Sequence, residues 1–103
     1  MTEGYRQRLK ELLEQRLVGS DLPPDSEVIV EPFGTGHAIW FVSDGFETWE
    51  WEWRAANALT FVRQVLTKED ADNVWACEGM TRADRDALLT AARRRNEAAH
   101  SAY

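Results

Sequence analysis

The sequence has little cysteine and no long apolar run, and both absences limit the kind of protein it can be. Cys77 is its one cysteine, so an internal disulfide is excluded, which agrees with a reducing compartment. No apolar run approaches the roughly 18 to 20 residues of a membrane-spanning helix. The N-terminal residues also lack the apolar core of a signal peptide. We therefore expect a cytoplasmic protein with no membrane partner.

Motifs for catalysis, metal binding and nucleotide binding are missing as well. The two histidines, His37 and His100, lie far apart, and the acids show no metal-ligand spacing. The glycine pair in Gly34-Thr35-Gly36 lacks the rest of a phosphate-binding or dinucleotide-binding loop. Cys77 has no neighbouring base, so we interpret it as a half-buried helix residue and not as a nucleophile. We expect no enzyme activity, no cofactor and no metal site.

Basic residues are absent from the middle of the chain. Residues 19–53 contain eight acids and neither Lys nor Arg, in a chain of 103 residues with a net charge of -6. Residues 81–103, in contrast, hold five Arg against three acids. The overall charge argues against general attraction to nucleic acid or to anionic membranes. The negative charge belongs to one central module, flanked by near-neutral or basic segments.

The length and the 44% hydrophobic content predict a single domain over residues 1–103 with one core. Its first element is a helix over residues 3–18, because Leu9, Leu12, Leu13 and Leu17 recur on one helical face. Gly19 then ends this helix.

Three strands are predicted next, at Glu27–Glu31, His37–Val42 and Phe46–Arg54, joined by short glycine turns. The middle strand is apolar on both faces, so we place it in the centre of the sheet. The third strand puts three indoles on one face and Thr48, Glu50 and Glu52 on the other. We expect the indoles to form the core beneath the following helix. An exposed aromatic platform for a partner is the open alternative. The indoles are Trp49, Trp51 and Trp53.

Three helices complete the prediction. An apolar face runs over residues 55–66, Thr67 caps a shorter helix over 68–78, and Thr81 with Asp84 begins the final helix. We expect residues 96–103 to fray. The fold class is α+β, in the order α-β-β-β-α-α-α: an N-terminal helix, a three-stranded antiparallel meander, a helix packed on the sheet and two further helices.

The order helix, three strands, helix resembles that of the double-stranded RNA-binding domain. The segment Arg54-Ala55-Ala56-Asn57-Ala58 is similar to the alanine-rich start of that family's second helix. The resemblance implies a helix lying on a sheet. That family grips phosphate with lysines at this helix start, and Arg54 stands alone here, so we carry over the fold and not RNA binding.

The function that these features favour is a non-enzymatic protein-interaction domain with an acidic sheet surface. It would act as a small inhibitor or adaptor of a basic, nucleic-acid-handling protein, and this composition is typical of a phage-type anti-defence or accessory inhibitor. The alternative is a nucleic-acid-binding module that uses the C-terminal arginines, and a homodimer is a further possibility. The predicted partner-binding residues are Glu27, Glu31, Asp44, Thr48, Glu50 and Glu52; the predicted nucleic-acid contacts are Arg82, Arg85, Arg93, Arg94 and Arg95.

Overall fold

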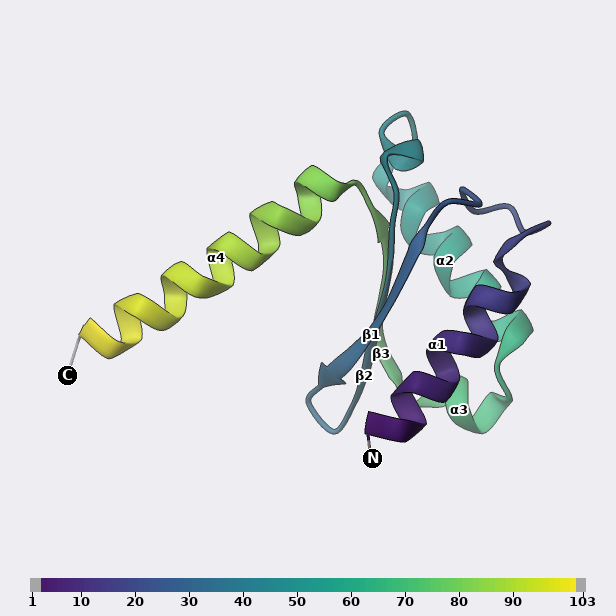
Figure 1. Ribbon diagram of the computed structural model, residues 1–103, viewed down its shortest axis with the longest axis horizontal. Helices are drawn as coiled ribbons and strands as arrows, with labels where there is room; N and C mark the ends of the chain where they lie inside the picture. The colour runs from purple at the N-terminus through teal and green to yellow at the C-terminus, as the bar shows by residue number, and fades with distance from the viewer. Residues whose placement is uncertain (1–2, 102–103) are drawn as a thin grey trace.

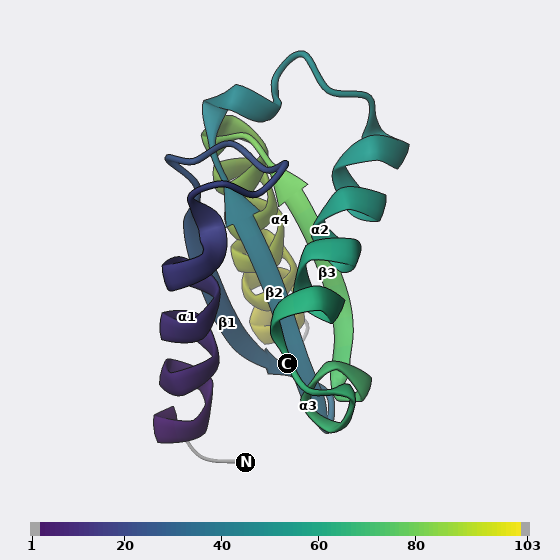
Figure 2. The same cartoon turned by 90° about the vertical axis from the view of Figure 1, so that its right-hand side faces the viewer.

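The computed structural model describes the backbone of residues 3–101 and the side chains of residues 3–97. Its three strands form one sheet in the order β1-β2-β3, with β1 and β2 antiparallel and β2 and β3 parallel. Two long helices cover one face of this sheet, and the last helix points away from the opposite side (Figures 1 and 2). The elements are α1 (Glu3–Leu17), β1 (Glu27–Phe33), β2 (Gly36–Val42), the 3-10 turn η1 (Asp44–Phe46), α2 (Trp51–Val65), α3 (Lys68–Asp72), β3 (Val74–Met80) and α4 (Arg82–Ser101).

The α+β class, the N-terminal helix and the three-stranded sheet are confirmed. Helix α1 buries Leu9, Leu13 and Leu17, the predicted i, i+4, i+8 face, against the sheet. Gly19 follows with a φ of +87°, the left-handed conformation in which glycine commonly ends a helix. The predicted central strand is confirmed too, because β2 lies between β1 and β3 and buries six of its seven residues.

The predicted strand over Phe46–Arg54 is wrong. The chain instead makes a 3-10 turn and begins α2 at Trp51. The indoles therefore do not share one buried face: Trp51 and Trp53 are 57% and 64% exposed, and Trp49 alone packs on the core, edge-on to Phe46 with 5.2 Å between ring centroids. The alternation of three aromatics is compatible with a strand, but the backbone N–H groups of Trp53 and Arg54 donate to the Glu50 carbonyl and close the first turn of α2.

The third strand is β3, in a segment predicted as helix. Helix α3 does begin after Thr67, whose hydroxyl accepts from the backbone N–H of Asp70, but it ends at Asp72. The apolar run of β3 then pairs in parallel with β2, so the sheet is mixed and not an antiparallel meander. Gly79 lies within this strand, where a Cβ atom would come within 2.5 Å of the buried Phe46 ring. The absence of a side chain at Gly79 therefore permits this close packing.

The element order also corrects the resemblance to the double-stranded RNA-binding domain, because α2 comes before the third strand and connects two parallel strands. The helix-on-sheet packing that the resemblance implied is present. Helix α4 begins with the predicted capping box, in which Thr81 and Asp84 each accept from the other's backbone N–H at 3.2 Å. It continues to Ser101, into the segment expected to fray; residues 102–103 lie outside the described residues.

Candidate functional site

Acidic side chains gather at one end of the sheet, where the loops over 18–26 and 43–50 lie beside each other. Glu27 begins β1 opposite Val42, the last residue of β2, and the Ser43 hydroxyl donates to Asp25 at 2.6 Å. This end is at the top of Figure 1, beside the start of α4. We call its seven exposed acids the acidic end: Asp21, Asp25, Glu27, Asp44, Glu47, Glu50 and Glu52.

Five of the six predicted partner-binding residues fall in or next to the acidic end. Thr48 lies exposed in the loop before α2, and Glu50 is the N-cap of that helix without a side-chain capping bond. Glu31 is the exception, since it lies on β1 facing α4. Arg85 pairs with its carboxylate at 3.1 Å and the Trp40 indole donates to it at 2.6 Å. Burial alone would raise the pKa of Glu31, but these hydrogen bonds outweigh it and hold the pKa below its ordinary value.

The predicted arginines divide into two groups. Arg82 and Arg85 hold the first turn of α4 against the body. The backbone N–H of Arg82 donates to Asp44 at 3.2 Å and its side chain lies 3.9 Å from the same carboxylate, while Arg85 binds Glu31. The two predicted surfaces thus meet and partly neutralise each other at the start of α4. The second group lies exposed further along the helix and consists of Arg93, Arg94 and Arg95.

Arg54, the first basic residue after the acidic stretch, has a structural role that no sequence motif indicates. Its side chain is 7% exposed and binds the Asp84 carboxylate at 3.0 Å. Its Nε donates to the Trp49 carbonyl at 3.1 Å, and its guanidinium stacks 4.6 Å from the centre of the Trp51 ring. The hydrogen bonds from Thr81, and then those from Arg54, hold the pKa of Asp84 below its usual range. Arg54 therefore ties α2, the loop before it and α4 together.

A groove of about 320 Å³ separates the base of α4 from the sheet. We call it the α4 groove. Its lining is largely apolar, and one lining residue, Glu78 of β3, has a pKa raised by burial. Glu78 makes no ion pair with the side chains of residues 3–97. The lining consists of Trp51, Glu78, Met80, Asp84, Ala87 and Leu88.

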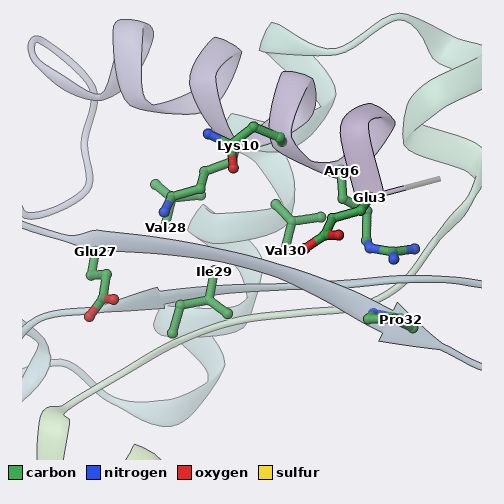
Figure 3. A pocket seen from close by; sticks show the side chains of 9 residues that line it. Glu3, Arg6, Lys10, Glu27, Val28, Ile29, Val30 and Pro32 are labelled. Atoms are coloured by element: carbon green, nitrogen blue, oxygen red, sulfur yellow. The ribbon is translucent and has the colours of Figure 1, made fainter.

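A second groove, of about 450 Å³, follows the free edge of β1 beneath α1 (Figure 3). Arg6 and Lys10 lie above the strand, but Glu3 and Glu27 line the same groove and balance their charge. His37 donates its N–H to Asn73 on the β3 side, so by the alternation of an antiparallel pair its opposite residue, Pro32, faces the free edge. Proline has no N–H to offer a further strand, so this edge is protected against pairing.

The groups best suited to catalysis are held in inert positions. His37 is fully buried and stacked on Tyr5, with 5.5 Å between ring centroids, and neither ring nitrogen has a hydrogen-bond partner among residues 3–97. Cys77 lies half-buried on β3, where burial raises the pKa of its thiol to about 12, far from the thiolate that nucleophilic attack requires. Across the described residues, no group of three His, Cys, Asp or Glu side chains could hold a metal ion.

Among the helices over residues 3–101, none combines the length and the apolar character needed to cross a membrane. No protein-family model, curated protein or solved structure matches the chain at a significant level.

Proposed function

We propose that this protein is a non-enzymatic interaction domain that binds a basic protein through its acidic end. More specifically, the protein would act as a small inhibitor or adaptor of a nucleic-acid-handling protein. Its acids would occupy the surface with which that partner binds phosphate. The observation that carries the proposal is the gathering of seven exposed carboxylates around two neighbouring loops.

The charge of the acidic end is largely uncompensated by the side chains of residues 3–97. Asp44 forms an ion pair with Arg82, and the other six acids form none with the described side chains. Arg54, the nearest basic residue in the sequence, is buried and bound to Asp84. A surface of one charge sign speeds and orients the approach of a partner of the opposite sign. A basic protein surface therefore suits this end.

Two exposed indoles lie next to these acids, at the start of α2. Trp51 and Trp53 are 57% and 64% exposed and alternate with Glu50 and Glu52 in the sequence. Tryptophan is enriched among the residues that contribute most to protein interfaces, because it buries a large area with few rotatable bonds. The indoles thus supply apolar contact beside the charges that orient the partner. The exposure of Trp51 and Trp53 thus supports, for two of the three tryptophans, the alternative of an exposed aromatic platform for a partner.

The alternative, nucleic-acid binding through the C-terminal arginines, has weaker support. Arg82 and Arg85 are engaged with Asp44 and Glu31, which leaves Arg93, Arg94 and Arg95 for phosphate contacts. Three cations on a chain of net charge -6 form a small basic patch.

The test is capture of partners from a lysate of the source cells with three forms of the tagged protein. Glu50→Lys with Glu52→Lys reverses two charges of the acidic end. Glu11→Lys with Glu14→Lys makes the same change on the exposed face of α1 and serves as the control. We expect a basic protein bound by the wild type and the control at low salt, and lost with the Glu50/Glu52 variant. Equal capture by all three forms would refute the proposal, and a partner released by nuclease would favour the alternative.

A further inference from the structure

Helix α4 is attached to the body by its first turn, and the side chains that follow are exposed as far as Glu97. Asp84 binds Arg54 and Arg85 binds Glu31, whereas every side chain from Asp86 to Glu97 is exposed. Twenty residues of helix extend for about 30 Å. Helices in proteins are stabilised mainly by packing of an apolar face, so a helix of this length attached by one turn lacks the usual cover.

The face that α4 turns toward the α4 groove follows a regular spacing. Asp84 and Leu88 line the groove, and helical periodicity places Ala91 and Arg95 on the same face, at i+7 and i+11 from Asp84. We call these four residues the stripe: along the helix it presents an acid (Asp84), a large apolar residue (Leu88), a small apolar residue (Ala91) and a base (Arg95). Leu88 is 48% exposed within it.

This stripe is complementary to the same stripe of a second, antiparallel copy of α4. When two such helices run antiparallel about a twofold axis midway between Leu88 and Ala91, Leu88 of each copy lies over Ala91 of the other. The same axis brings Arg95 of each copy opposite Asp84 of the other, because the midpoint between residues 84 and 95 coincides with the midpoint between residues 88 and 91. One symmetry operation thus satisfies both the apolar pair and the charge pair, as an isologous interface requires.

The groove also offers this arginine a second acid. Glu78 lies half-buried on β3 in the lining of the groove and makes no ion pair with the side chains of residues 3–97. A carboxylate next to apolar surface is stabilised by an incoming cation that replaces lost water.

We infer that the occupant of the α4 groove is a second copy of this chain, whose α4 packs antiparallel with Arg95 directed at Glu78 and Asp84. This interface shares Trp51 with the surface proposed to bind a partner but includes none of the seven acids of the acidic end. The Leu88 variants and the charge reversal at Glu50 and Glu52 therefore test the two proposals separately. Both acidic ends remain free in such a dimer.

Sedimentation velocity on the purified chain at about 100 µM tests the inference. We expect a dimer of twice 11.8 kDa, and a monomer for Leu88→Asp. Leu89→Asp is the matched control, since Leu89 is also 48% exposed but points about 100° away from Leu88 around the helix. Because both leucines are half-exposed, neither change should unfold the monomer, which circular dichroism checks. A monomeric wild type, or equal disruption by both variants, would overturn the inference.

A charge exchange separates this packing from other dimers. Arg95→Glu should weaken self-association at least tenfold, and adding Glu78→Lys should restore it by reversing the pair. If the double variant associates no better than Arg95→Glu alone, Arg95 does not meet Glu78 and the proposed packing is wrong.

Discussion

Removing the Asp84 carboxylate should destabilise the fold far more than its position on the surface suggests. In Asp84→Ala, the guanidinium of Arg54 stays buried but loses its ion-pair partner, and the Thr81 N–H loses its capping acceptor. Breaking a buried ion pair from one side costs about 3 to 5 kcal/mol. The Asp84 side chain is 34% exposed, so water compensates part of this loss and the low end applies. We expect the free energy of unfolding to fall by about 3 kcal/mol.

Urea denaturation followed by tryptophan fluorescence measures this change, because Trp49 and Trp51 contact Arg54 and report on its surroundings. Asp86→Ala is the control, as it removes the same charge from an exposed position on the same helix and should change the free energy by no more than about 0.5 kcal/mol. Adding Arg54→Met to Asp84→Ala should recover part of the loss, since no buried charge is then left unpaired. A loss below about 0.5 kcal/mol for Asp84→Ala would refute this account of Arg54.

Three further predictions concern the core. Gly79→Ala should cost about 1 to 3 kcal/mol because its Cβ meets the Phe46 ring, and Phe46→Leu should relieve part of that cost; equal costs in both backgrounds would contradict the clash. Burial and then Arg6 lower the pKa of His37 below 6.5, so the unfolded chain takes up a proton that the folded chain resists. Stability should therefore fall as the pH drops below about 6.5, by at most about 1.4 kcal/mol per pH unit, and His37→Leu should remove this dependence in denaturation at pH 5 to 8. Cys77, with its pKa of about 12, should react slowly with iodoacetamide at pH 8 in the folded chain and fully in guanidinium.

Local signals predicted local structure well. The leucine spacing located α1, and the residues Thr67 and Thr81 correctly marked where α3 and α4 begin, because capping depends on a few neighbouring atoms. The apolar character of β2 also identified the centre of the sheet.

The errors arose where distant parts of the chain decide the structure. The alternating tryptophans fit a strand equally well, but Trp51 meets Arg54 at the i, i+3 spacing of a helix, and Arg54 is fixed by Asp84, thirty residues away. Likewise, β3 forms by pairing in parallel with β2, from which it is separated in the sequence by α2 and α3. A parallel pair has no tight turn between its strands, so no turn residues indicate it.

The candidate site could be predicted in part. The acidic stretch over 19–53 identified the side chains of the acidic end, because folding brings its two loops together. The sequence could not indicate that Glu31 and Arg85 bind each other. Glu31 lies in the acidic stretch and Arg85 in the arginine-rich segment, and these two segments were predicted to form separate binding surfaces. The α4 groove depends on the angle at which α4 leaves the sheet, which the sequence pattern does not encode locally.

The most direct test of the proposed function is the salt dependence of binding to the captured basic partner. The affinity should fall steeply between about 50 and 500 mM salt, because exposed charges are screened over a Debye length of about 10 Å at 0.1 M. The variant with Glu50→Lys and Glu52→Lys should bind at least tenfold more weakly at low salt and with a shallower dependence. An affinity that is the same at both salt concentrations, or unchanged by the charge reversal, would contradict binding through the acidic end.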